Sequence, residues 1–173
     1  MPGSVLLIPF FLIRFGLLAA LGQNAVRRAA HFPPLRGVER FAYWIYQITT
    51  VAILIGLFFV RIKTAPSTVF YAGVSAVSFR AILLSASMVN FAAPSASGLN
   101  QSGLYRLSRN PMYVAYFIYF IGCALLTQSA GTLAAVLAFQ LSAHWIILAE
   151  ERWCLETFYE QYQRYMERVR RYI

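Results

Sequence analysis

Five long apolar segments alternate with short polar ones along the chain. The apolar segments cover residues 5–22, 41–62, 67–91, 111–128 and 131–149. A helix needs about 20 residues to cross the hydrocarbon core of a bilayer, and each segment is close to or above that length. The pattern therefore predicts an all-α integral membrane protein with five transmembrane helices.

The first apolar segment has an alternative interpretation, a cleavable signal peptide. Such a peptide begins with a basic region, which is lacking here, and the segment itself contains Arg14. The composition favours a membrane protein throughout, because 60% of the residues are hydrophobic and the mean hydropathy is +0.59. We interpret the segment as the first span.

The chain reads as a single membrane domain, residues 1–173, with two regions. Residues 1–91 form a three-span scaffold, and residues 92–173 contain a polar loop, a helical hairpin over 111–149 and a tail that mixes charged and aromatic residues. In the tail, Phe158, Tyr162 and Tyr165 fall on one helix face. We expect an amphipathic tail helix that lies on the membrane surface or folds over the cytoplasmic mouth of the hairpin.

Basic residues are distributed unequally between the two predicted membrane sides. Eleven of the fifteen Lys and Arg residues lie in 23–40, 92–110 and the tail, against only Arg61 and Lys63 on the other side. The positive-inside rule then places the N-terminus outside and the tail in the cytoplasm. We attribute the net charge of +9 to topology and contact with anionic membrane lipid, with no nucleic-acid partner. The two cysteines lack metal-ligand spacing, so no metal site is predicted.

Two polar clusters flank the hairpin, and the first is a helix start. Asn110 is expected to cap the helix and Pro111 to occupy its first position. The free amides and the dipole at such a start favour an anion, and Arg106 and Arg109 add positive charge beside it. A plain cap with topology-setting arginines is the alternative.

The second cluster, Glu150 and Glu151, ends the hairpin. Burying two adjacent carboxylates at a membrane boundary is costly unless cations or hydrogen-bond donors meet them. Gln140, His144 and Glu151 share one helix face, which either satisfies polar groups inside the bundle or leads to a site. Because the two clusters meet on one membrane side, they suit a zwitterionic ligand. We expect Glu151 to serve ligand binding more than folding.

Together the clusters resemble the isoprenylcysteine carboxyl methyltransferase and phospholipid methyltransferase superfamily over roughly residues 100–173. The matching residues are Gly103, Tyr105, Arg109, Asn110, Pro111, Tyr113, Glu150, Glu151, Arg152, Phe158, Tyr162, Tyr165 and Val169. The chain departs from the usual pattern in having Asn110 for His, Ala115 for Gly, Cys154 for Leu and Tyr159 for Gly. Asn still donates and accepts hydrogen bonds but cannot titrate.

The resemblance implies a membrane enzyme that uses S-adenosyl-L-methionine, bound at the cytoplasmic mouth of the last two spans. It implies cofactor-binding roles for Tyr105, Arg109, Asn110, Pro111, Tyr113, Glu150 and Glu151. The methyl acceptor would be a lipidic or amphiphilic carboxylate, thiol or amine. Direct displacement needs little acid–base chemistry for the first two, whereas an amine must first lose a proton, with His144 or a Glu as the candidate base.

Two alternatives remain open at this stage. Membrane sterol or enone reductases that use NADPH carry a similar Arg-His-Pro-x-Tyr motif, although the Glu-Glu pair argues against them. A small non-enzymatic membrane subunit would use Arg14 and Arg80 along a water-filled path, while their simpler role is snorkelling or pairing inside the bundle.

Overall fold

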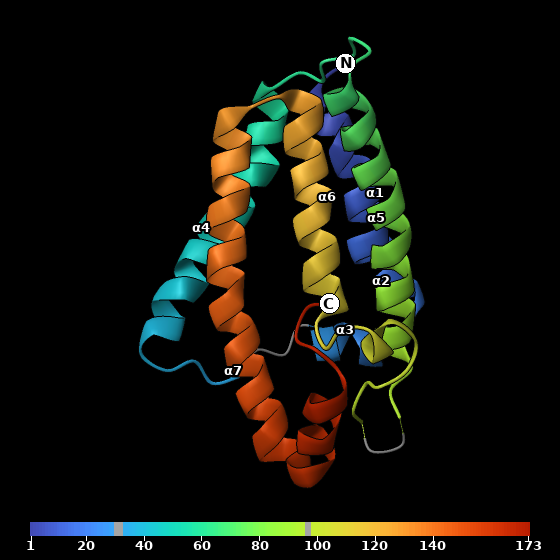
Figure 1. Ribbon diagram of the computed structural model, residues 1–173, viewed down its shortest axis with the longest axis vertical. Helices are drawn as coiled ribbons and strands as arrows, with labels where there is room; N and C mark the ends of the chain where they lie inside the picture. The colour runs from blue at the N-terminus through green and yellow to red at the C-terminus, as the bar shows by residue number, and fades with distance from the viewer. Residues whose placement is uncertain (30–32, 96–97) are drawn as a thin grey trace.

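The computed structural model describes residues 1–29, 33–95 and 98–173, and the regular structure of these residues is helical (Figure 1). The N-terminal part consists of η1 (Gly3–Leu6), α1 (Leu7–Phe11), η2 (Leu12–Leu17), α2 (Leu18–Ala20) and α3 (Gln23–Ala29). The rest contains α4 (Val38–Phe59), α5 (Thr68–Ala92), η3 (Gly103–Arg106), α6 (Pro111–Thr127) and α7 (Ala130–Arg168). Within the N-terminal part, η2 is a π-helix.

Four helical stretches have the length and apolar composition to cross a membrane, namely 3–20, 38–59, 68–92 and 130–168. The fifth predicted segment corresponds to α6, which is apolar but has 17 residues. Its length is about 25 Å, slightly below the usual hydrocarbon thickness. The all-helical membrane class is therefore confirmed, while a count of five crossings depends on α6.

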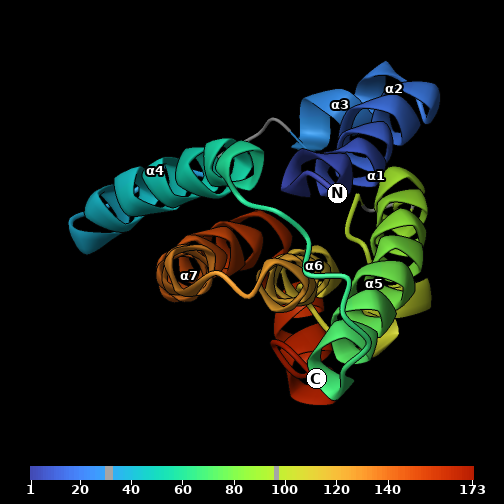
Figure 2. The ribbon, with the colours of Figure 1, turned by 90° about the horizontal axis from the view of Figure 1, so that it is seen from above.

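The short helix α6 lies at the centre of the bundle. It packs against α5 and α7, whereas α4 packs along the other side of α7 (Figures 1 and 2). Phe10 brings the N-terminal part against Tyr116, Tyr119 and Phe120 of α6. Contact on several sides explains why α6 is apolar all round.

The two ends of the bundle contain different parts of the chain. At one end Gly3 N donates to Val60 O at 2.9 Å, and Lys63 N donates to Leu126 O at 2.8 Å. This joins the N-terminus, the α4–α5 connection and the neighbourhood of the α6–α7 turn. The opposite end holds α3, the segment before α6 and the C-terminal tail (Figure 1). The basic clusters of the sequence accordingly lie at one end.

The tail differs from the prediction in where it begins. Helix α7 continues past Glu150 and Glu151, and the chain reverses only at Tyr159, which has φ 45° and ψ −126°. Residues 160–168 then turn back toward the bundle (Figure 1). Both carboxylates find partners inside the fold and do not interrupt the helix. Tyr162 and Tyr165 are buried with Leu99, which confirms a tail folded over the mouth of the hairpin.

The reversal at Tyr159 places a side chain in a backbone region that favours glycine. We expect Tyr159→Gly to raise the free energy of unfolding by about 1 kcal/mol, because the relieved strain exceeds the added chain entropy. Little packing is lost, since the Tyr159 side chain is exposed. Thermal unfolding of the detergent-solubilised protein measures the effect. Tyr159→Ala is the control, because it retains the strain and should bring no such gain.

Candidate functional site

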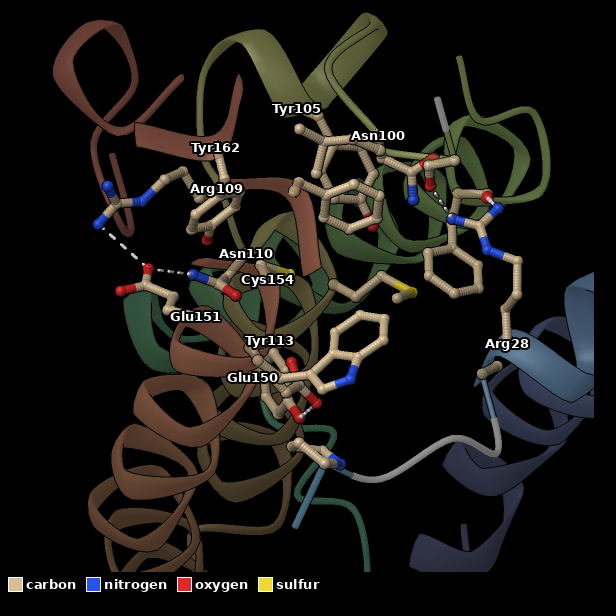
Figure 3. A pocket seen from close by; sticks show the side chains of 18 of the residues that line it. Arg28, Asn100, Tyr105, Arg109, Asn110, Tyr113, Glu150, Glu151, Cys154 and Tyr162 are labelled. Carbon is tan, nitrogen blue, oxygen red and sulfur yellow. Dashed lines mark hydrogen bonds and ion pairs between the residues drawn. The ribbon is translucent and has the colours of Figure 1, made fainter. Parts of the chain in front are cut away.

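A cavity of about 500 Å³ lies at the end of the bundle that holds the tail (Figure 3). Helices α6 and α7, the segment before α6, the N-terminal part and α4 all contribute to its wall. Of the seven cofactor-binding residues predicted from the sequence, six line it: Tyr105, Arg109, Asn110, Tyr113, Glu150 and Glu151. Residues from both polar clusters thus converge on one space, although their role in binding stays a prediction.

The segment before α6 is fixed by Asn90 of α5. Its Oδ1 accepts a hydrogen bond from Leu104 N at 2.9 Å. Gly103 passes directly over this side chain with φ 57°, and a Cβ there would come within 2.2 Å of Asn90 Oδ1. Only glycine fits this approach. The contact sets the position of Tyr105, the next residue but one, and burial raises the pKa of the Tyr105 phenol.

Among the predicted cofactor-binding residues, Glu151 forms the largest set of ion pairs and side-chain hydrogen bonds. Its carboxylate lies 3.1 Å from Arg109 Nη2 and 2.8 Å from Arg171 Nη2, and only 5% of its side chain is exposed. Arg171 Nε donates a further bond to it at 3.0 Å. This hydrogen bond, with the nearby negative charge, raises the pKa of the Arg171 guanidinium. Glu151 therefore joins the segment before α6 to the tail, and its role in ligand binding stays a prediction.

Asn110 precedes α6 as predicted but does not cap it with its side chain. Its Nδ2 instead donates to Glu151 Oε1 at 3.3 Å and to Arg171 O at 3.2 Å. The predicted side-chain cap is wrong because these two bonds orient the side chain through its NH2 group, and its oxygen accepts no hydrogen bond from the first turn of the helix. Pro111 does occupy the first turn of the helix, and it sets the helix start without lining the cavity.

Backbone contacts attach the tail to the same segment. Arg109 N donates to Arg170 O at 2.9 Å, and Ser108 Oγ donates to Arg171 O at 3.3 Å. Tyr165 Oη donates to Tyr105 O at 2.6 Å. These bonds hold the tail across the cavity, where Tyr162 and Tyr165 form part of its wall.

Glu150 is oriented differently from its neighbour. It is partly accessible, lines the cavity, and its Oε1 accepts a hydrogen bond from Tyr113 Oη at 2.7 Å (Figure 3). Among the described residues, no Lys or Arg forms an ion pair with it. The cavity thus presents one carboxylate that is not neutralised by a cation.

His144 lies away from this space. Its Nδ1 is 2.6 Å from Tyr172 Oη, and it is not among the residues that line the cavity. Of the polar face that it shares with Gln140 and Glu151, only Glu151 lines the cavity. A role of His144 as a base stays a prediction.

Several lining residues come from the region that the sequence analysis treated as scaffold. Arg14, Arg28, Tyr46 and Phe91 all contribute to the wall. Arg28 Nη1 donates to Phe91 O at 2.8 Å, and burial lowers the pKa of its guanidinium. A signal existed for Arg14, since an arginine within an apolar span points to a functional site. Nothing in the sequence marks the others.

A second ion pair attaches α4 to α7. Arg152 bonds to both carboxylate oxygens of Glu39, with Nη2 2.9 Å from Oε2, and also donates to Pro34 O at 2.8 Å. This pair stands at the same end of the bundle as the cavity. It fixes the start of α4, and with it the wall contributed by Tyr46.

The described residues form a helical bundle with membrane-length apolar helices and a cavity whose wall includes the C-terminal segment. The family comparison makes the class specific, because residues 68–162 match the family described as Phospholipid methyltransferase. The match covers more than half of the chain, so the chain belongs to this family of membrane methyltransferases. Neither the comparison with curated proteins nor that with solved structures gave a significant match.

Removing the charge of Glu151 should lower the stability of the folded protein. Glu151→Gln leaves the buried Arg109 guanidinium without its carboxylate, and we expect the free energy of unfolding to fall by about 3 kcal/mol or more. Denaturant or thermal unfolding in detergent provides the measurement. The control is Glu156→Gln, because Glu156 pairs with Arg36 at the exposed surface and should change stability by about 0.5 kcal/mol or less. Equal stability of the two variants would contradict the structural role.

Proposed function

We propose that this protein transfers the methyl group of S-adenosyl-L-methionine to a lipidic or amphiphilic acceptor at the cytoplasmic face of the membrane. The observation that carries the proposal is the convergence of six motif residues from two distant clusters on one cavity. Membership of the family supports the reaction type. It also argues against the NADPH-dependent reductase and the non-enzymatic subunit.

The cavity has the properties that the cofactor requires. Its volume of about 500 Å³ lies in the range of small-molecule sites. Tyr105, Phe158 and Tyr162 offer aromatic surface to an adenine ring, and the buried Asn100 Oδ1 has no partner among the described residues. A base amine can satisfy that acceptor atom. Glu150 can accept hydrogen bonds from ribose hydroxyls.

The bound cofactor supplies a methyl group on a sulfonium centre, which is open to direct displacement. The contribution of the chain is alignment and exclusion of water, which the tail across the cavity favours. A carboxylate or thiolate acceptor needs no base. An amine acceptor must lose its proton, and the Glu150 carboxylate beside Tyr113 is the group in the cavity that can take it.

The proposed membrane arrangement follows from the charge distribution. With α6 counted as a span, we propose that five helices cross the bilayer, and the basic clusters support a cytoplasmic position for the tail and the cavity mouth. Because α6 is short, its start lies below the level of the membrane surface. The cavity then adjoins the lipid phase, where a lipidic acceptor resides.

Labelled S-adenosyl-L-methionine should bind saturably to the purified protein, and NADPH should not. Incubation with membrane lipid extract should yield a labelled lipid. For an amine acceptor, Glu150→Gln should lower this transfer by about a hundredfold, because the proton acceptor is lost. Glu160→Gln is the matched control, since that carboxylate is exposed beside Arg164 and does not line the cavity. Saturable binding of NADPH alone would contradict the proposal.

The orientation is tested separately with reporters fused after Ile173. In a bacterial host, green fluorescent protein at this position should fluoresce, and alkaline phosphatase should be inactive, because each reports the side of the membrane on which it folds. An active phosphatase would place the tail outside and reverse the topology.

A further inference from the structure

Arg14 occupies an unusual position for a charged residue. It lies in η2, inside the apolar stretch 3–20, six residues before its end. At 1.5 Å per residue this is about 9 Å into the helix. Its guanidinium lies 5.9 Å from the centre of the Tyr116 ring, and no carboxylate among the described residues forms an ion pair with it.

Three other arginines line the cavity, and each differs from Arg14. Arg28 bonds to the carbonyl oxygens of Phe91 and Gly98, Arg109 bonds to Glu151, and Arg27 is exposed. Arg14 is partly buried within an apolar stretch and leaves a positive charge at the cavity wall without an ion-pair partner among the described residues. An ionisable residue in this situation within a membrane span indicates a ligand or an ion path.

The Tyr116 hydroxyl is a second polar group at this position. It is buried beside the Arg14 guanidinium, which can only donate to it, so no acceptor among the described residues takes the hydroxyl proton. Both side chains line the cavity. A guanidinium and a hydroxyl donor together match an oxyanion, which accepts several charge-assisted hydrogen bonds. The π-helical turn that carries Arg14 is also a feature enriched at functional sites.

The depth of this pair relative to Glu150 indicates how a ligand would lie. Tyr113 and Tyr116 are three residues apart on α6 and project from the same face, with Tyr113 nearer the helix start. Arg14 and Tyr116 therefore stand about one helical turn deeper in the membrane than the Tyr113–Glu150 pair. A lipid with its tails in the bilayer has its phosphate at a deeper level than the rest of its headgroup, which matches this order.

We propose that Arg14 and Tyr116 form an oxyanion subsite that binds the phosphate of a lipid, with the remainder of the headgroup directed toward Glu150. The inference rests on the proposed function, since the lipid is the methyl acceptor. It adds the residues that select an anionic lipid, and it assigns the N-terminal part a direct role in acceptor binding.

The test compares two short-chain probes, dihexanoyl phosphatidic acid and dihexanoylglycerol, by calorimetry on the detergent-solubilised protein. Wild type should bind the phosphate-bearing probe at least about tenfold more tightly, and Arg14→Gln should lose this preference. Tyr116→Phe should weaken binding of that probe severalfold. Arg80→Gln is the matched control, because it removes an arginine from a membrane-spanning helix but not from the cavity, and it should bind like wild type.

The outcomes separate this subsite from the proposed function. If wild type binds both probes equally, the subsite is overturned whatever the variants do. This result does not depend on whether Arg14→Gln folds. Competition by inorganic phosphate as strong as by the lipid probe overturns a lipid-specific site. The affinity for S-adenosyl-L-methionine, measured on the same samples, should be unchanged in Arg14→Gln. A loss there would assign Arg14 to the cofactor, and absence of cofactor binding in wild type would overturn the proposed function.

Discussion

The structure depends on one buried carboxylate shared by two guanidinium groups. Glu151 on α7 meets Arg109 from the segment before α6 and Arg171 from the tail, so three parts of the chain are positioned by one side chain. In a medium of low polarity such a group is stable only when fully paired, which makes the arrangement sensitive to any missing partner. Of these three side chains, Arg109 and Glu151 line the cavity and Arg171 does not. The network therefore neutralises its own charge at the wall, and Glu150 is the carboxylate there that forms no ion pair among the described residues.

The central helix α6 organises the cavity along the membrane normal. Asn110 belongs to the network at its start, Tyr113 contacts Glu150 one turn later, and Tyr116 faces Arg14 in the turn after that. One helix face therefore carries a sequence of polar groups of different chemical character at increasing depth. Close packing of α5 on the other side, through Gly73 and Gly122, keeps this face in register.

The sequence was sufficient to predict the helical class and the order of the segments, because the length of an apolar segment is a local property. It also predicted that the two clusters converge, because the spacing of the motifs puts both at one end of the hairpin. It could not show that Asn110 bonds to Glu151 instead of capping α6, since that choice depends on a carboxylate 41 residues away. The reversal at Tyr159 was equally hidden, because a tyrosine gives no local signal for positive φ. Arg28 and Tyr46 reach the cavity only through packing between distant helices.

The pairing of α4 with α7 has a consequence for how the protein is made. Glu39 and Arg152 are 113 residues apart, and α4 packs mainly on α7 although α5 and α6 are synthesised in between. At about 5 to 20 residues per second, Arg152 leaves the ribosome about 6 to 23 s after Glu39. During that interval the face of α4 that later packs on α7 is open to lipid, although the end of α4 can already contact η1, and Glu39 at its start lacks Arg152. The early membrane intermediate is therefore a loose set of helices, which becomes an enclosed bundle only when the last hairpin is inserted.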